Sequence, residues 1–159
     1  MSDTDRADGF EEHRHHLFGV AYRMLGGVGE AEDVVQEAWL RWDRADREVI
    51  DRPRAWLTTV VSRIAIDRLR SAQVRRETYV GPWLPEPILT TSDDPAEHAE
   101  LADSLSVAFL TMLERLDPVE RAAFLLREVF GHDYDEVAAT IDRSATNCRQ
   151  IVHRAKERL

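Results

Sequence analysis

The sequence has one cysteine, one lysine and no long apolar run. Because Cys148 is alone, an internal disulfide is excluded, and we expect this thiol to fill a core rather than to react. No run of about 20 apolar residues is present, and the acidic start MSDTDRADGF does not resemble a signal peptide. The sequence therefore predicts a cytoplasmic protein with no membrane partner. Lys156 is the only lysine, so arginine supplies nearly all of the positive charge, which indicates a GC-rich genome.

The sequence also lacks the patterns of an enzyme. Its one cluster of candidate catalytic groups is the run EEHRHH, from Glu11 to His16. The spacing is not that of a His-Glu-x-x-His zinc site, and no cysteine ligand accompanies it, so a solvated, histidine-rich helix start is expected. A glycine-rich phosphate loop and a nucleophile motif are missing from the sequence. We therefore expect no catalytic activity, no cofactor and no metal.

Positive charge is confined to two short segments of an acidic chain. The formal net charge of −9 taken alone argues against nucleic-acid binding, because phosphate contacts depend on Lys and Arg. However, residues 52–76 carry 7 basic side chains and 1 acidic one, and residues 143–159 carry 5 basic side chains and 1 acidic one. Residues 77–107, between them, carry 7 acidic side chains and no basic ones. This pattern predicts two phosphate-facing patches, one in each half; ordinary solvated helix faces remain the alternative.

Apolar residues recur at three- and four-residue spacing along the chain, and no run alternates like a strand, so the fold class predicted is all-α. Helices are expected at about 10–25, 30–43, 53–71, 95–116, 118–130, 134–141 and 145–159. Pro53 and Pro118 suit first helical turns, where the missing N–H is harmless. The helix starts are marked by candidate N-caps at Asp94, Asp117, Asp133 and Ser144.

A proline-rich segment divides the chain. The stretch TYVGPWLPEPILTTSD has three prolines and a glycine, so it cannot be one continuous helix. We therefore expect two small helical domains, 1–76 and 94–159, joined by a linker at 77–93. Trp83 and Leu84 either belong to a solvated tether or dock on a neighbouring domain.

Each domain has its own expected core of apolar residues. The expected core of the first domain is Phe10, Leu17, Ala21, Met24, Ala31, Val34, Val35, Ala38 and Trp42. The expected core of the second domain is Leu101, Leu105, Met112, Leu125, Val129, Val137 and Ile141.

The C-terminal segment has the pattern of a helix-turn-helix. A short helix ends before Asp142-Arg143, and a Ser-capped helix comes next. On a helical wheel its buried stripe is Ala145, Cys148, Ile151, Val152, Ala155 and Leu159, and its outer face is Thr146, Asn147, Arg149, Gln150, His153 and Arg154. Arg149 suits guanine and Gln150 suits adenine in the major groove, while Arg143, Arg154 and Lys156 suit phosphates. The alternative is a two-helix corner with an ordinary polar face.

The helix expected at 53–71 carries an unusual arc. Leu57, Val61, Ile64 and Ala65 point one way, and a second cluster gathers elsewhere on the helix: Trp56, Arg63, Asp67 and Arg70. Aromatic and guanidinium groups together suit unstacked bases of single-stranded DNA. For Trp56 alone, a partly buried core tryptophan is an equal alternative.

Three segments resemble, in order, the signature segments of extracytoplasmic-function sigma factors: GVGEAEDVVQEAWLRW, PRAWLTTVVSRIAIDRLRS and YDEVAATIDRSATNCRQIVHRAKERL. The resemblance implies sigma region 2 in the first half and sigma region 4 in the second. It also implies an RNA polymerase core partner, through its largest-subunit clamp helices and its flap region, and promoter DNA. The clamp-helix contact would use Asp33, Gln36 and Glu37. The minus-10 element would be bound by Trp56, Arg63, Asp67 and Arg70, with help from the loop at 43–52, and the minus-35 element by Arg143, Ser144, Thr146, Asn147, Arg149, Gln150, His153 and Arg154.

The sequence departs from the family pattern at three positions. Arg63 stands where many relatives carry Asn, Asp142-Arg143 replaces the commoner Gly-Ile, and Ile151 replaces an Arg. The linker segment YVGPWLPEP is similar to that of a subgroup in which a SnoaL-like domain follows region 4. That domain is absent from this sequence, which leads to the hypothesis of a missing C-terminal extension. Either that extension or an anti-sigma factor is the further partner implied.

Two non-enzymatic alternatives remain open. A stand-alone helix-turn-helix regulator would bind duplex DNA without polymerase, but it leaves the acidic helix at 30–43 and the Trp56 arc unexplained. A helical interaction module would not bind DNA at all. Since overall acidity opposes the two basic patches, we expect the free chain to bind promoter DNA weakly.

Overall fold

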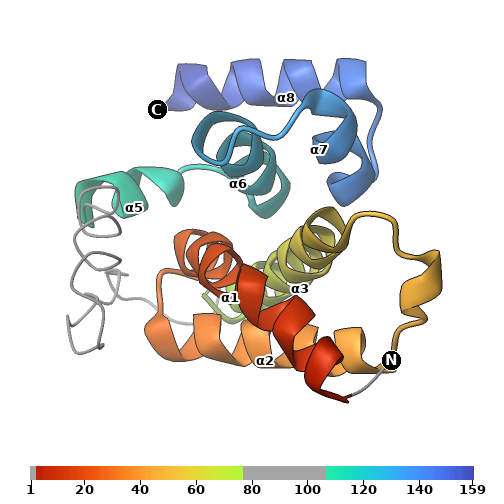
Figure 1. Ribbon diagram of the computed structural model, residues 1–159. Coiled ribbons are helices and arrows are strands. Elements are labelled where there is room, and N and C mark those ends of the chain that lie inside the picture. The colour runs from red at the N-terminus through yellow and green to blue at the C-terminus, as the bar shows by residue number, and fades with distance from the viewer. Residues whose placement is uncertain (1–2, 77–106) are drawn as a thin grey trace.

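The computed structural model describes residues 3–76 and 107–159, and every regular element in these two ranges is helical (Figure 1). The all-α prediction is therefore confirmed. The first half comprises α1 (Asp3–Leu25), α2 (Val28–Arg44), the short 3₁₀ helix η1 (Arg47–Val49) and α3 (Pro53–Arg76). The second half comprises α5 (Val107–Leu113), α6 (Pro118–Phe124), the π-helix η2 (Leu125–Val129), α7 (Tyr134–Ile141) and α8 (Ala145–Arg158).

The first three helices form a bundle around the apolar face predicted from their periodicity. Every expected core residue of this half is buried, from Phe10 on α1 to Trp42 on α2. Gly26 ends α1 with a positive φ of 76°, a conformation that favours glycine. The start of α1 lies at Asp3 rather than near Phe10, because Trp42 holds the extra turns: its indole Nε1 donates to the Arg6 carbonyl oxygen over 3.0 Å.

The helices of the second half begin at the residues that the sequence marks as caps. Side-chain oxygens of Asp117, Asp133 and Ser144 each accept the backbone N–H three residues ahead. Asp94, Leu101, Leu105, Trp83 and Leu84 lie outside the described residues, as does most of the helix expected at 95–116. Its described part, α5, ends at Leu113, and the chain reaches α6 through a tight turn.

The helix expected at 118–130 is not a single α-helix. Its last five residues form η2, a π-helical turn in which the backbone gains one residue relative to the α-helical pattern. The extra residue rotates the end of the helix, so Val129 is 37% exposed and the prediction that it belongs to the core is wrong. Met112 is only half-buried, whereas Leu125, Val137 and Ile141 are buried as expected.

The two halves are packed directly against each other. In Figure 1, α6 and α7 lie between the α1–α3 bundle and α8, so α8 is on the far side from the first half. Helix α3 packs on α7 and α6, and α1 contacts α6 and η2. Apolar residues of both halves belong to one continuous buried cluster. None of the helices in the described ranges is long and apolar enough to cross a membrane.

Candidate nucleic-acid interface

The predicted helix-turn-helix is formed by α7, a three-residue turn and α8. Asp142 ends α7 in the left-handed conformation, with φ of 56° and ψ of 52°. Aspartate is one of the few non-glycine residues that adopt this region readily, so the turn keeps its geometry without the commoner glycine. The Ser144 hydroxyl accepts the Asn147 backbone N–H over 3.0 Å and fixes the first turn of α8.

Helix α8 separates a buried stripe from an open polar face. Cys148, Ile151, Val152 and Ala155 are buried, while Ala145 and Leu159 are half-buried. The candidate readers on the other side are exposed, except for the half-buried Asn147: Arg143, Ser144, Thr146, Arg149, Gln150, His153 and Arg154. The placement is the one a helical wheel gives, and α8 itself lies on the far side of α6 and α7 from the first half (Figure 1). The face therefore presents arginine, amide and hydroxyl groups, which are the side-chain types that contact base edges in the major groove.

Ion pairs hold the flank of α8 and occupy some of its cations. Lys156 Nζ lies 2.7 Å from a Glu128 carboxylate oxygen, and Arg158 Nη1 lies 2.8 Å from Glu120. Lys156, expected to contact phosphate, is thus already paired within the protein. Arg143, Arg149 and Arg154 at the exposed face are the better candidates for DNA contacts.

The arc predicted on α3 is divided between solvent and the second half. Asp67 and Arg70 are exposed, whereas Trp56 is half-buried with its ring centroid 5.9 Å from that of Trp42. Trp56 also lines a groove of about 590 Å³ between the start of α3 and α7. Trp56 is therefore partly buried, as one interpretation from the sequence expected, and base stacking by its remaining exposed part stays a prediction.

Arg63 is bound to the end of α7. Its Nε donates to the Thr140 carbonyl oxygen over 3.0 Å and its Nη2 to the Ala139 carbonyl oxygen over 2.9 Å. The last carbonyls of a helix lack intrahelical partners and carry partial negative charge, so a guanidinium stabilises them. Beside it, the Thr59 and Thr140 hydroxyl oxygens lie 3.0 Å apart. A side chain expected to face promoter DNA therefore joins the two halves.

A second arginine makes the reciprocal contact from α6. Arg121 is 5% exposed, and its Nη1 donates to the Met24 carbonyl oxygen over 2.6 Å, next to the end of α1. Each half therefore places an arginine on a helix C-terminus of the other. The sequence carries a weak signal for this, because Arg121 falls on the face of α6 that also buries Pro118 and Ala122.

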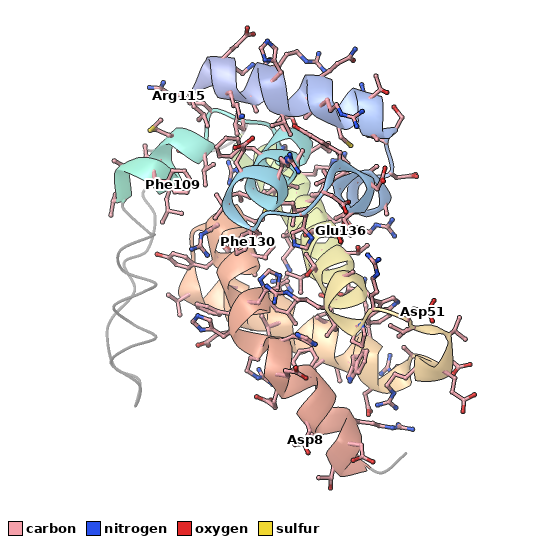
Figure 2. The ribbon with its side chains drawn as sticks, turned by 45° about the horizontal axis from the view of Figure 1, so that its top comes forward. Asp8, Asp51, Phe109, Arg115, Phe130 and Glu136 are labelled. Carbon is pink, nitrogen blue, oxygen red and sulfur yellow. The ribbon has the colours of Figure 1, made fainter. Side chains whose placement is uncertain are left out.

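Phe130 fixes the π-helical corner onto α1 and lies at the junction of the two halves (Figure 2). Its ring packs edge-on against His16, with centroids 5.1 Å apart, and the Arg23 guanidinium carbon lies 4.9 Å from its centroid. Burial lowers the pKa of Arg23.

His16 is held neutral at this junction. Its Nε2 lies 3.1 Å from the buried Thr58 hydroxyl, and its Nδ1 is 3.3 Å from the Arg54 guanidinium. Burial first, then the positive charge of Arg54, lowers the pKa of His16 to about 3. Of the run expected to be a solvated helix start, His15 is exposed as expected but His16 is turned inward. The reason is the packing of Phe130, which the sequence does not reveal.

The candidate polymerase-binding residues lie along α2. Asp33 and Gln36 are exposed, while Glu37 is half-buried. Glu37 pairs with Arg41 one turn away, over 3.0 Å, and with Arg68 of α3, over 3.5 Å. The face is therefore partly neutralised at Glu37 and acidic at Asp33.

Within the described ranges, no group of three or more His, Cys, Asp or Glu side chains is arranged to hold a metal ion. Cys148 is buried, as expected of a core-filling residue, and burial raises the pKa of its thiol. The burial of Cys148 agrees with the helical wheel, which places this residue on the inner face of α8.

The chain is similar to known proteins over nearly all of its length. Residues 10–75 match the family model for Sigma-70 region 2, and residues 106–159 match that for Sigma-70, region 4. It is 51% identical over 150 residues to the ECF RNA polymerase sigma factor SigJ of Mycobacterium tuberculosis, a match that covers 93% of this chain and 48% of SigJ. The chain spans about half the length of that relative.

Two solved structures have the same arrangement of helices. The crystal structure of Mycobacterium tuberculosis SigJ superposes with a TM-score of 0.76 at 45% identity, over 96% of this chain and 52% of that one. The sigma factor RpoE from Bartonella quintana, in complex with the anti-sigma factor NepR, gives a TM-score of 0.70 at 20% identity, over 97% and 93%. The RpoE match supports the fold alone.

Proposed function

We propose that this chain, which belongs to the extracytoplasmic-function sigma factors, directs core RNA polymerase to promoters in the cytoplasm by binding two DNA elements, without catalysing a reaction. The single observation that carries the proposal is the open polar face of α8 on a complete helix-turn-helix, in a chain whose two halves match the two sigma regions.

The second half would bind the minus-35 element as duplex DNA. Arg149 would donate to guanine and Gln150 to adenine, both in the first turns of α8, the part of a recognition helix that enters the major groove. Arg143, Ser144 and Arg154 would contact phosphates, and Thr146, Asn147 and His153 would complete the surface.

The first half would bind the minus-10 element as unstacked single strand. Trp56 would stack on a base, and Arg63 and Arg70 would contact phosphates or bases, with Asp67 between them. In the described arrangement Arg63 is bound to α7 instead. Binding of a promoter base or phosphate by Arg63 would require its hydrogen bonds to the Thr140 and Ala139 carbonyl oxygens of α7 to break. The halves would therefore have to separate on the promoter.

The polymerase partner would bind α2. An outward face with Asp33, Gln36 and part of Glu37 complements a basic partner helix, in keeping with the clamp helices of the largest subunit. The second half would contact the flap region. An anti-sigma factor, or a C-terminal domain of this protein outside the present sequence, would be the regulatory partner, and the junction of the two halves is where it would act.

The experiment is a pull-down of core RNA polymerase by the chain and by three variants. One replaces Asp33, Gln36 and Glu37 by alanine, and one replaces only Asp33 and Gln36, which leaves the Glu37 ion pairs with Arg41 and Arg68 intact. The matched control replaces three exposed residues of α1, Asp8, Glu12 and His15, by alanine, with the same loss of two carboxylates.

We expect the wild-type and control chains to retain core polymerase and both α2 variants to lose it at least in part. Equal loss in the control would show that the effect follows net charge rather than the α2 face. No binding by the wild type would overturn the proposal and leave a stand-alone helix-turn-helix regulator as the better account.

A further inference from the structure

Two arginines share one aromatic ring beside the DNA-facing surface. Tyr134 is the first residue of α7 and is half-buried. The guanidinium carbon of Arg149, on α8, lies 5.1 Å from the centre of its ring, and that of Arg127, on η2, lies 4.4 Å from it. Both distances are within the range of a cation–π attraction.

The ring itself is held in place by its surroundings. Gly131 turns the chain with a φ of 70°, and the Asp133 carboxylate accepts the Glu136 backbone N–H over 2.8 Å to cap α7. Arg127 Nη1 also donates to the His132 carbonyl oxygen over 3.2 Å, which ties η2 to the turn before Tyr134. The backbone that carries the half-buried ring is therefore fixed, whereas Arg149 is an exposed and long side chain.

We infer that Tyr134 is a positioning residue that holds Arg149 in a conformation ready to read a base pair of duplex DNA, with Arg127 as a second cation on the same support. The inference rests on the proposed function, since it assumes that α8 reads the minus-35 element. A free arginine samples many rotamers and loses that freedom on binding DNA. Ordering the side chain beforehand reduces this loss and sharpens the choice of base.

The physical alternative is that Tyr134 only fills space between η2, α7 and α8. In that case its removal would weaken folding or all DNA contacts equally. A positioning role predicts instead that the sequence preference is lost only at the base pair that Arg149 reads. It also predicts that this preference is retained when the ring is kept.

The test is selection from a pool of duplex DNA with a randomised window, by the free chain at low salt, where electrostatic binding is strongest. Arg149 and Gln150 are exposed in the chain by itself, so polymerase is not required. Arg149→Ala identifies the position that Arg149 reads. Tyr134→Leu and Tyr134→Gln remove the ring, Tyr134→Phe keeps it, and thermal unfolding shows which variants are folded.

We expect the two ring-less variants to lose about two- to fivefold of the preference at the Arg149 position and none elsewhere, and Tyr134→Phe to retain it. A uniform loss at all positions, full retention by the ring-less variants, or an equal loss in Tyr134→Phe would each overturn the inference. If Arg149→Ala alters no position, base reading by Arg149 is wrong, and the positioning role is overturned together with that part of the proposed function. If Arg149→Ala does alter one position, only the role of Tyr134 is at issue.

Discussion

The two surfaces proposed to bind DNA differ in how much of each is available in the folded chain. On α8, the candidate readers are exposed and lie on the far side of the molecule from the first half. On α3, Arg63 is bound to the end of α7 and Trp56 lines the groove beside it. The candidate residues on α8 are therefore open to a partner, whereas on α3 only Asp67 and Arg70 are, and Arg63 is engaged by the second half.

This difference has a physical basis in the contacts of each helix. Helix α8 buries one apolar stripe against its own half and leaves the opposite face to solvent. Helix α3 is buried on one side by α1 and α2 and is then contacted by α6 and α7 on another. The arginine contacts across this junction are specific but few. The proposed separation of the halves would therefore need a partner that contacts one half more strongly than the other half does.

The largest effect is expected from removing the arginine that α6 places on α1. Arg121→Ala deletes a buried, charge-assisted hydrogen bond to the Met24 carbonyl oxygen and leaves a cavity, so we expect the free energy of unfolding to fall by about 3 kcal/mol. Urea denaturation measures it, and Arg115→Ala, at an exposed position just before α6, is the control. A loss no larger than in the control would mean that Arg121 does not hold the halves together.

Arg63→Ala is expected to weaken the junction by less, about 1.5 kcal/mol, because Arg63 is partly solvated. Hydrogen exchange of the amides of α7 should quicken by roughly tenfold, since opening of the junction exposes the helix end. Arg70→Ala, at an exposed position of the same helix, is the control and should leave exchange unchanged. Unchanged exchange in both variants would show that the Arg63 contact does not limit opening.

Acid should loosen the junction through His16. The pKa of His16 in the folded chain is lowered to about 3 by burial, with contributions from Arg54, His132, His13 and Arg23. An unfolded histidine titrates near pH 6.5, so below that pH the unfolded chain binds a proton that the folded chain does not. The contribution of neutral His16 to the free energy of unfolding is therefore fully present above about pH 6.5 and is lost as the pH drops toward 3.

At pH 5.5 this loss amounts to about 1 kcal/mol, once partial exposure of the ring is allowed for. The difference in unfolding free energy between wild type and His16→Gln, measured at pH 7.5 and pH 5.5, should shrink by that amount. His15→Gln, at the exposed neighbouring position, should show no such change. A difference that stays constant with pH would contradict the assignment of His16 as a buried neutral residue.

The smallest effect is expected at the turn before α8. Asp142 has a positive φ, so Asp142→Gly should relieve backbone strain and raise the unfolding free energy by about 0.5 kcal/mol. Asp142→Val should lower it, because a β-branched residue tolerates this conformation poorly. Denaturation midpoints of the two variants measure the effect. Destabilisation by glycine would show that the Asp142 side chain makes a contact more important than the strain.

Much of the local structure could be predicted because it depends on short-range rules. The faces of α2 and α8 follow from apolar spacing, and the starts of α6, α7 and α8 follow from Asp117, Asp133 and Ser144, each with a side-chain oxygen for the N–H three residues ahead. The π-helical turn could not be predicted in this way. Nothing in the local sequence marks an inserted residue, and the insertion is the reason that Val129 is exposed rather than buried.

The exposure of the candidate DNA-binding residues was predicted more completely on α8 than on α3. Exposure of Arg149 and Gln150 depends only on the packing of one helix face within its own half. The engagement of Arg63 depends on a backbone 76 residues away, at Ala139, and that of Arg121 on a backbone 97 residues away, at Met24. Periodicity carries no information about partners at such separations.

The sequence by itself determined the helical class, the helix faces, the caps and the family, because each of these depends on neighbours within a few turns or on motifs in order along the chain. Only the tertiary structure decided which charged residues remain available to a partner. Packing of α3 against α7 assigned Arg63 to a helix end, and packing of Phe130 against α1 assigned His16 to a neutral, buried state. Both outcomes require segments far apart in the sequence to meet, which no local pattern specifies.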